Sequence, residues 1–477
     1  MDGLECSEKN LSIVASTTTL RLDSDYYKKE YLNIENIILD RNCNFTTIES
    51  MGLTVNASAF YPSLEPYYNT GEIPFIRVAD VKTQINYEDC VRIPKMNSDF
   101  NTLYLCKKGD IVLTKGGSVG NVGLITQDSY VTRDLIFINS SVLERADYIT
   151  LYLFFSSNFM YKQMIKSSSY SVQPHLTITL IRELLMYQYS NSFKKIVSFI
   201  FEQSEKKIGL SKQAYCQAEQ LLLTALGIAD FTPSSEPVAI KLFSKSFTTS
   251  GRLDAEYYQP KYDGIEDKLA QFETTNINIE FDTFKNSCSE YSESGEIGVV
   301  KTKQLTNVEI NKAVESFITR EVVFDNKLTL LEKNDVLFAS MGVGSLGKVS
   351  IYYGESSLVT DSTLKIYRKK LKGKIAPEVL TLFFQSVVGQ ELIYKYVVGS
   401  TGIINIYDKD INKIPIPILP DKKQKEIATK VQESFELRHQ SEQLLEYAKT
   451  AVEMAIEQGE EKAMEWLKDK GVECNNV

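Results

Sequence analysis

The apolar positions along the chain follow two different spacings, which predict short strands and long helices. Short apolar runs at 74–78, 135–138 and 297–300 have the length and composition of β-strands. Two longer stretches, 193–226 and 422–458, carry apolar residues at intervals of three and four and contain no proline. A glycine follows each of them, as is typical at the end of a helix. The pattern therefore predicts a mixed α/β protein with two long helices.

The apolar faces of the two long helices are both interrupted near the middle. The apolar residues are Ile196, Ile200, Leu210, Ala214, Leu221 and Ala225 in the first helix and Ile427, Val431, Leu445, Ala448, Val452 and Ala455 in the second. Polar residues interrupt these faces at Gln203 and Lys207 and at Ser434, Arg438 and Ser441. Faces that match in this way can pair as in a coiled coil. We expect an antiparallel pair; the alternative is that each helix packs only on the strands before it.

The chain repeats itself at a distance of 225 to 231 residues. Arg21–Tyr27 (RLDSDYY) returns as Arg252–Tyr258 (RLDAEYY), an offset of 231. Lys108–Leu113 matches Lys333–Phe338 at an offset of 225, and Gly117–Val122 matches Gly344–Val349 at 227. An ordered series of matches over almost the whole chain indicates two homologous modules. The segment 230–237, which is rich in proline and serine, has the composition of a linker between them.

Composition narrows the class of protein. The chain has 477 residues, 43% of them hydrophobic, and no apolar run approaches the ~18 residues of a membrane-spanning helix. Seven scattered cysteines without a CxxC pair, and only two histidines, His175 and His439, argue against a disulfide framework or a zinc site. The acidic start lacks the basic residues of a signal peptide. We therefore expect a cytoplasmic protein that is not bound to a membrane and holds no metal ion.

A glycine-rich loop follows the same predicted strand in both modules. Ser118 and Asn121 lie in the first loop, with Lys115 just before it, and Ser345 and Lys348 lie in the second. Neither loop continues as the Gly-Lys-Ser/Thr of a nucleotide-binding P-loop. A tight turn between two strands is the simpler interpretation of the glycines. The shared position, with a lysine beside exposed backbone N–H groups, favours contact with phosphate as the alternative.

A second pair of polar loops lies late in each module. The first includes Lys166, Ser168, Gln173 and His175, and the second includes Ser400, Thr401 and Asn405. The loops share a position but differ in sequence. One scaffold with two different loops suits a protein that recognises two different sequences, whereas solvated loops without function are the alternative.

The formal charge of −9 is unusual for a protein that binds nucleic acid by bulk charge alone. Basic residues nevertheless form two candidate tracks, one with Arg77, Lys82, Lys115, Arg133 and Lys166 and one with Lys301, Lys303, Lys348 and Lys365. The second long helix and the tail are rich in glutamate and account for much of the acidity. Each basic residue taken singly can also be an ordinary surface charge.

Motifs for catalysis are weak in this chain. Asp254 with Glu266-Asp267-Lys268 resembles a nuclease D…(D/E)xK pattern, but the first module has no counterpart. The Asn/Asp-Pro-Pro-Tyr/Phe motif of a methyltransferase is absent, and no nucleophile stands beside His175. We therefore expect no catalytic residues.

Taken in order, these motifs resemble the specificity subunit of type I restriction–modification systems. The resemblance rests on the duplicated RLDx(D/E)YY, on the Lys-x-Asp-(Ile/Val) strand followed by Gly-Ser-x-Gly, and on 414–420 (IPIPILP) followed by 424–428 (QKEIA). The motifs are individually weak, but their order occurs twice and covers nearly the full chain. In the first module, 187–190 (YQYS) replaces the proline-rich segment.

The resemblance implies two α/β target-recognition domains in tandem, each followed by a long helix, with the helices paired as an antiparallel coiled-coil spacer. The expected bounds are an N-terminal segment 1–20, a first domain 21–192, a first helix 193–229, a linker 230–251, a second domain 252–420, and a second helix with its tail 421–477. Each domain would read one half of a split, asymmetric site in double-stranded DNA. The basic tracks and the polar loops would then contact the DNA.

The resemblance also implies protein partners. Two methyltransferase subunits, and then restriction subunits, would bind along the helices, whose expected contact residues are Ile196, Ile200, Leu210, Leu221, Ile427, Val431, Leu445 and Val452. The methyltransferase subunits, not this chain, would bind S-adenosylmethionine. Two alternatives stay open: a scaffold that binds proteins but no DNA, and an enzyme that uses the Gly-Ser loops as active-site turns.

Overall fold

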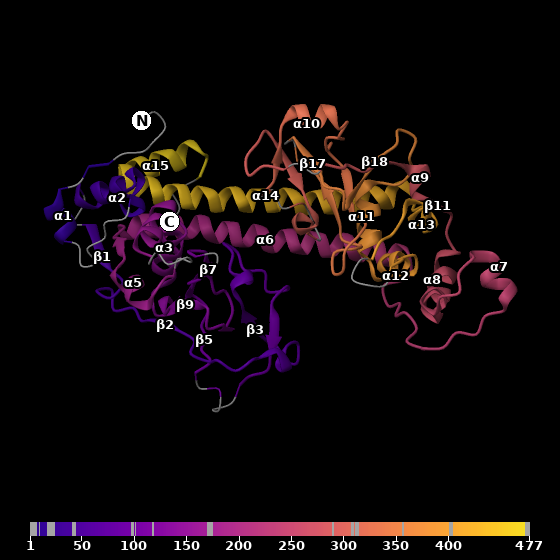
Figure 1. Ribbon diagram of the computed structural model, residues 1–477, viewed down its shortest axis with the longest axis horizontal. Coiled ribbons are helices and arrows are strands. Elements are labelled where there is room, and N and C mark those ends of the chain that lie inside the picture. Colours follow the sequence, from indigo (N-terminus) through magenta and orange to yellow (C-terminus); the bar gives the residue numbers. More distant parts are fainter. Residues whose placement is uncertain are drawn as a thin grey trace. The chain divides into compact units, whose positions relative to one another are not determined.

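The chain forms two compact units (Figure 1). The structure, a computed structural model, describes residues 7–8, 10–16, 24–40, 44–96, 100, 102–116, 119–168, 175–288, 291–306, 310, 314–354, 357–399 and 404–472. Unit 1 comprises 1–206 together with 440–477, and unit 2 comprises 207–439. Each unit therefore contains one part of each long helix, α6 (Asn191–Ala225) and α14 (Asp421–Gln458).

Three small sheets build the described part of unit 1. The first is antiparallel, with the order β2 (Val55–Ala57), β9 (Leu135–Ile138), β6 (Ile111–Thr114), β7 (Val122–Leu124). The second has the order β4 (Val91–Ile93), β3 (Ile73–Ile76), β8 (Ser129–Val131), β5 (Leu105–Cys106), and in it only β3 and β8 are parallel. The third pairs β1 (Phe45–Thr47) with β10 (Leu185–Tyr187).

Helices bury the apolar residues of unit 1. They are α1 (Leu11–Ser16), α2 (Lys29–Asp40), α3 (Arg145–Phe155), α4 (Asn158–Ser167), α5 (Ile178–Glu183) and α15 (Glu460–Asp469). The core joins Ile136 of β9, Tyr152 and Phe154 of α3, and Leu467 of α15, all of which are at most 1% exposed. The C-terminal helix α15 thus belongs to the core of unit 1.

The described part of unit 2 repeats this order of strands, with three instead of four strands in the second sheet. Its first sheet has the order β12 (Phe281–Phe284), β18 (Leu364–Lys369), β15 (Asp335–Ala339), β16 (Val349–Tyr352); its second has β14 (Phe317–Ile318), β13 (Ile297–Val300), β17 (Leu358–Thr360); its third pairs β11 (Thr274–Thr275) with β19 (Ile416–Pro417). Its helices are α7 (Phe247–Ser250), α8 (Pro260–Leu269), α9 (Ile277–Glu280), α10 (Arg320–Asp325), α11 (Pro377–Gln385), α12 (Val387–Lys395) and α13 (Asp408–Ile411). The predicted mixed α/β class and the internal repeat are confirmed.

Both long helices begin after the same kind of short strand. Gln188 N donates to Asn44 O at 2.8 Å after β10, and Ile418 N donates to Glu273 O at 2.8 Å after β19. The YQYS segment and the proline-rich segment therefore hold the chain in the same way, although only one of them contains proline. The helices 193–226 and 422–458 predicted from the sequence are confirmed to within two residues at each end.

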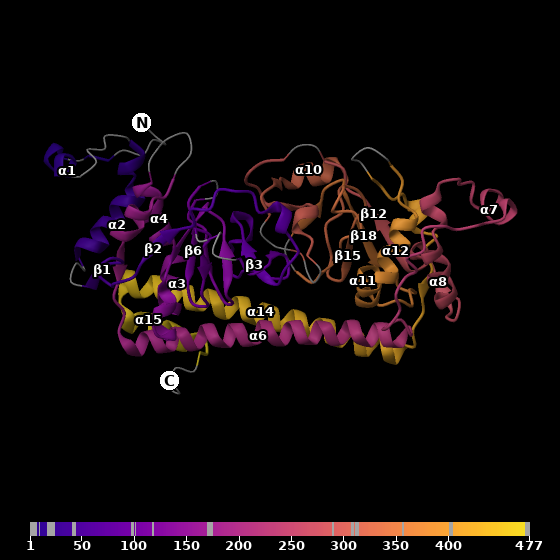
Figure 2. The same ribbon diagram turned by 90° about the horizontal axis from the view of Figure 1, so that it is seen from below.

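The long helices pair in antiparallel fashion within each unit. In unit 1, the first part of α6 lies beside the last part of α14, and Ser204 Oγ is 2.9 Å from Ser441 Oγ (Figure 2). In unit 2, the last part of α6 lies beside the first part of α14, and Ser211 Oγ is 3.0 Å from Ser434 Oγ. The predicted antiparallel pairing is confirmed, and we call the buried line of contact between the two helices the seam.

The apolar residues expected to bind partner proteins lie mostly inside the chain. Ile196, Ile200, Leu445 and Val452 belong to the core of unit 1, Ile427 and Val431 belong to that of unit 2, and Leu221 packs against the latter. Leu210 differs, because 42% of its surface is exposed. Of these residues, Leu210 is thus the one that stays open to a partner protein.

Candidate nucleic-acid interface

Parallel strands gather basic residues at one edge of the second sheet in unit 1. Phe75 and Ile76 of β3 lie opposite Tyr130 and Val131 of β8 in a parallel ladder. The two strands therefore end on the same side, and Thr132 N donates to Ile76 O at 3.0 Å there. Arg77 and Arg133 follow directly. We call this side of the parallel pair the carboxyl edge.

The two arginines of this edge have different neighbours. Arg77 binds Asp80 through its main-chain N at 2.9 Å and through Nε at 3.1 Å, and this contact raises the pKa of the guanidinium. Arg133 lies over the ring of Tyr61, 5.0 Å from its centroid, and 4.0 Å from Asp134. Tyr61 is 74% exposed. An exposed cation beside an exposed aromatic ring suits contact with both phosphate and base.

Unit 2 has the same edge with different residues. The parallel strands β13 and β17 end together, and Asp361 N donates to Val300 O at 3.0 Å. Lys301 follows Val300 and lies 4.6 Å from the centroid of the Tyr291 ring, and its Nζ donates to Ser316 Oγ at 2.7 Å. Burial raises the pKa of Tyr291 above its ordinary value. A cation and a tyrosine thus meet at the carboxyl edge of both units.

The remaining cations near these edges are exposed to solvent. Lys82 lies just after the 3₁₀ turn Val78–Asp80, and Lys303 lies in the equivalent turn Thr302–Gln304. Lys303 Nζ is 2.5 Å from Glu315 Oε2, and this hydrogen bond lowers the pKa of the carboxyl. Because both side chains of this ion pair are exposed, water and salt weaken it.

The Gly-Ser loops are turns between two antiparallel strands, as the simpler interpretation predicted. They join β6 to β7 and β15 to β16. Gly120 and Gly347 close the two turns with φ of 86° and 87°, a backbone conformation that favours glycine. Asn121 and Lys348 follow these glycines and are exposed, whereas Ser345 is half-buried. Ser118 lies outside the described residues, and contact with phosphate stays a prediction.

The described ends of the late polar loops lie beside the Gly-Ser loops. In unit 1, Leu176 N donates to Lys115 O at 3.0 Å, and the exposed His175 ring lies against Gly116. In unit 2, the equivalent bond joins Ile406 N to Ser340 O at 3.0 Å, which places Asn405 where unit 1 has His175. Lys115 and His175 are thus brought together. Gln173, Ser400 and Thr401 lie outside the described residues.

Three predicted contact residues are buried instead of exposed. Lys166 forms an ion pair with Glu35 and lies 4.5 Å from the centroid of the Tyr26 ring. Lys365 is 2.6 Å from Asp408, and burial lowers its pKa. Ser168 Oγ donates to Ile165 O at 2.7 Å at the end of α4. Side chains that are already satisfied inside the protein are poorly placed to reach a ligand, so we leave these three out of the interface.

The equivalent of Lys166 is a residue that sequence reasoning missed. Lys395 forms an ion pair with Glu266 and lies 5.1 Å from the centroid of the Tyr257 ring. The tyrosines of the duplicated RLDx(D/E)YY motif therefore help to hold a buried lysine at the end of α4 and of α12. The offset of 229 between Lys166 and Lys395 was the signal that could have identified this pair as structural.

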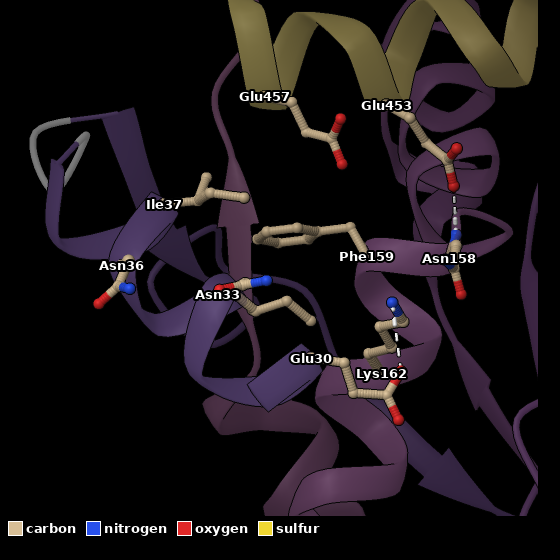
Figure 3. A pocket seen from close by; sticks show the side chains of 10 residues that line it. Glu30, Asn33, Asn36, Ile37, Asn158, Phe159, Lys162, Glu453 and Glu457 are labelled. Atoms are coloured by element: carbon tan, nitrogen blue, oxygen red, sulfur yellow. Dashed lines mark hydrogen bonds and ion pairs between the residues drawn. The ribbon is translucent and has the colours of Figure 1, made fainter. Parts of the chain in front are cut away.

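A cavity of about 500 Å³ opens in unit 1 between α2, α4 and α14 (Figure 3). Glu30, Glu453 and Glu457 line it, and the ring of Phe159 lies between the three helices. Asn158 N donates to Glu453, whose pKa is raised by burial. An acidic lining repels phosphate, so this cavity does not belong to the proposed interface.

Two further features bear on the class of protein. No helix in the described part of the chain is long and apolar enough to cross a membrane. Among the described residues, no group of three or more histidine, cysteine, aspartate or glutamate side chains could hold a metal ion.

Comparison with known proteins identifies the family. The type I restriction modification DNA specificity domain matches residues 53–213 and 275–447. The S subunit of a type I restriction-modification system from M. genitalium is 12% identical, with a TM-score of 0.40, over 86% of this chain and 94% of that one. The HsdS subunit from Thermoanaerobacter tengcongensis is 11% identical, with a TM-score of 0.27, over 86% and 97%.

These TM-scores describe a loose superposition, and the assignment rests on the sequence family. No curated protein matches the chain. The family match covers more than half of the sequence, in two segments that fall on the two repeated modules. The chain therefore belongs to the family of type I restriction modification DNA specificity domains.

Proposed function

We propose that this chain is the sequence-reading subunit of a restriction–modification complex, in which each unit reads one half of a bipartite site in double-stranded DNA. The observation that carries the proposal is the repeated carboxyl edge, where Arg133 meets Tyr61 in unit 1 and Lys301 meets Tyr291 in unit 2. The two cations come from different strands of the same edge, Arg133 after β8 and Lys301 after β13, which suits two readers of different sequences.

The contacts divide into two kinds. Arg77, Lys82 and Arg133 in unit 1, and Lys301, Lys303 and Lys348 in unit 2, contact phosphate and set the position of the DNA. The loops around His175 and Asn405 face the bases and supply the preference for sequence. Lys115 and Asn121 support the first loop, and Ser345 the second. The residues Ser118, Gln173, Ser400 and Thr401 stay candidates for the same role.

The chain acts together with partner proteins. Its formal charge of −9 limits its affinity for DNA when it is alone, so methyltransferase subunits supply further phosphate contacts. Two such subunits, followed by restriction subunits, dock along the exposed faces of α6 and α14, where Leu210 is available. They bind S-adenosylmethionine and carry out the chemistry, whereas this chain is not catalytic. The complex works in the cytoplasm.

The paired helices act as the spacer between the two readers. The first recognition domain precedes α6 and the second precedes α14, so an antiparallel pair sets the distance between them. The domain bounds given above, 21–192 and 252–420, describe these readers. A scaffold that binds proteins but not DNA is the main alternative, and it predicts no effect of the edge residues on DNA binding.

The test uses the chain in complex with its methyltransferase subunits. Arg133→Gln should weaken binding by roughly three- to tenfold at low salt, as expected for one lost phosphate contact. Lys107→Gln is the matched control, because Lys107 binds Asp128 next to the opposite end of β8. In unit 2, Lys301→Gln is compared with Arg320→Gln, since Arg320 pairs with Glu296 at the start of β13. Equal effects of edge and control variants would refute the interface.

A further inference from the structure

Serines join the two long helices directly. In unit 1, Ser204 Oγ donates to Ser441 O at 2.9 Å, and Ser441 Oγ donates to Ser204 O at 2.7 Å. In unit 2, Ser211 Oγ and Ser434 Oγ are 3.0 Å apart. All four serines are at most 1% exposed. Because a short side chain reaches the opposite main chain in unit 1, the helices lie close together there, and a larger residue would not fit without displacing them.

The two serine pairs belong to a single register. The two residue numbers add up to 645 in both pairs, as one continuous antiparallel register requires. The same sum matches Val197 with Ala448 in unit 1 and Ala214 with Val431 in unit 2, and all of these are buried. On each helix the serines are seven residues apart, which is one heptad.

A slip by one heptad is the smallest change of register that keeps the apolar faces together. In one direction the sum becomes 638, and Ser211 then faces Ile427 while Ser441 faces Val197. Branched side chains would have to fit where the helices approach most closely, which overpacks the seam. The volume of these branched side chains therefore makes this change of register unfavourable.

The slip in the other direction places small residues opposite two of the serines. The sum becomes 652, and Ser204 then faces Ala448 while Ser434 faces Ala218. Alanine is small enough to fit. The slip would, however, leave the hydroxyls of Ser204 and Ser434 in a buried seam without their partners on the opposite helix, which is unfavourable. The observed register is the one of the three that pairs all four serines.

We propose that the two buried serine pairs set the register of the helix pair, and that they act against the slip toward longer separation. Only the consequence for the DNA site rests on the proposed role of the helices as a spacer. A slip to the sum of 652 moves the start of α14 away from the start of α6 by seven residues, about 10 Å, which is roughly three base pairs. The serines would thus hold the gap between the half-sites constant.

Cross-linking in the full-length chain tests the register itself. Val197→Cys with Ala448→Cys reports the observed register, and Val197→Cys with Ala455→Cys reports the slipped one, because these residue numbers add up to 645 and 652. One heptad separates the two by about 10 Å, beyond the ~7 Å limit between Cα atoms for a disulfide. Peptide mapping distinguishes these cross-links from any that involve the seven native cysteines.

With the serines intact, the 197–448 cross-link should be the main product and the 197–455 cross-link a minor one. Replacing all four serines by alanine should raise the 197–455 product by roughly tenfold, as expected for about one net hydrogen bond lost per pair. The variant Ser204→Ala with Ser211→Ala, which disturbs each pair once, should give an intermediate yield and covers the case in which the fourfold variant does not fold. None of these variants alters Tyr189, whose Oη donates to Val452 O in the observed register.

If the alanine variant still forms only the 197–448 cross-link, the serines do not set the register and the inference is wrong. Mapping of methylated sites in cells that carry the alanine variant tests the spacer separately. Additional sites with a gap about three base pairs longer would support both ideas. A shifted cross-link with an unchanged gap would keep the serine inference and reject the spacer.

Discussion

The two units have the same frame but differ where a ligand would bind. Lys166 with Glu35 and Lys395 with Glu266 occupy equivalent places, and each lysine lies over a tyrosine of the duplicated motif. The order of strands in the sheets is also the same, except that the described part of unit 2 has no counterpart of β5. What duplication has preserved is the set of contacts that ties α2 in unit 1 and α8 in unit 2 to the rest of the unit.

The differences gather at the carboxyl edge and in the loops. Arg133 and Tyr61 meet in unit 1, whereas Lys301 and Tyr291 meet in unit 2. The Gly-Ser loop of unit 2 is two residues longer, since its closing bond joins 347 to 339 whereas that of unit 1 joins 120 to 114. Variation at this edge and in the loops of an otherwise similar frame is what two readers of different sequences require.

One structural pair also differs in the sign of its charges. Glu30 of α2 binds Lys162 of α4 at 3.3 Å, whereas in unit 2 Lys261 of α8 binds Glu391 of α12 at 2.6 Å. A mistaken pairing of α2 with α12, or of α8 with α4, would bring like charges together. The reversal therefore favours the correct partner during folding of two similar modules, although each pair alone contributes little.

The largest expected difference between the units comes from α15. Leu467 is fully buried in the core of unit 1, whereas in unit 2 the segment after α6, 228–242, contains no helix. Leu467→Ala should destabilise unit 1 by about 3 kcal/mol through the lost burial and the cavity that remains. Hydrogen exchange measured on peptides from each unit should increase in unit 1 only. An equal increase in unit 2 would contradict the assignment of α15 to unit 1.

The equivalent lysines should give a smaller and symmetrical effect. Lys166→Ala should destabilise unit 1, and Lys395→Ala unit 2, each by roughly 2 kcal/mol, because a mostly buried lysine loses its carboxylate and its aromatic neighbour. Lys303→Ala is the exposed control and should change stability by less than about 0.5 kcal/mol. Hydrogen exchange measured separately for each unit is again the readout. If Lys166→Ala destabilised unit 2, or Lys395→Ala destabilised unit 1, the two lysines would not be equivalent.

The repeat made much of this fold predictable from the sequence. The series of offsets identified two modules, and the three-and-four spacing of apolar residues identified both long helices. The Gly-Ser turns followed from the glycines alone. The helices and turns depend on local patterns of residues, and the repeat can be read directly by comparing the two halves of the sequence.

The site was harder to predict because it depends on pairing between distant segments. Nothing local in the sequence shows that Lys166 faces Glu35, or that Arg133 lies over Tyr61. The seam was also predicted only in part: Ser434 and Ser441 were recognised as polar interruptions, but their partners Ser204 and Ser211 were not. Both pairings become visible only when the opposite helix is present.

A still smaller effect distinguishes residues that position the DNA from residues that recognise its bases. Lys348→Gln in unit 2 should weaken binding of all DNA sequences similarly and reduce the slope of log affinity against log salt by about 1, because a phosphate contact carries no base information. The position equivalent to Lys348 in unit 1 is Asn121, so Asn121→Gln should leave the slope unchanged. A change of preference at one half-site caused by Lys348→Gln would contradict its role as a phosphate contact.

The smallest expected effect is a pH dependence of stability that occurs in unit 1 alone. Burial raises the pKa of Glu453 in unit 1, so the folded unit holds this proton more tightly than the unfolded chain, and stability falls as pH rises through the titration. Glu453→Gln should therefore slightly raise the unfolding temperature of unit 1 at pH 7 and leave it unchanged near about pH 4. In unit 2 the equivalent residue is Leu223, and no such pH dependence is expected there.

The central claim is that two different readers are held at a fixed distance by the helix pair. Its most direct test is an insertion of seven residues into both helices, between Lys207 and Ile208 in α6 and between Leu437 and Arg438 in α14. One heptad keeps the seam in phase and lengthens the spacer by about 10 Å, roughly three base pairs. Methylated sites are then mapped across the genome of cells that also carry the methyltransferase subunits. The account predicts that both half-sites are retained and the gap grows by about three base pairs. An unchanged gap in a folded and active variant would contradict it.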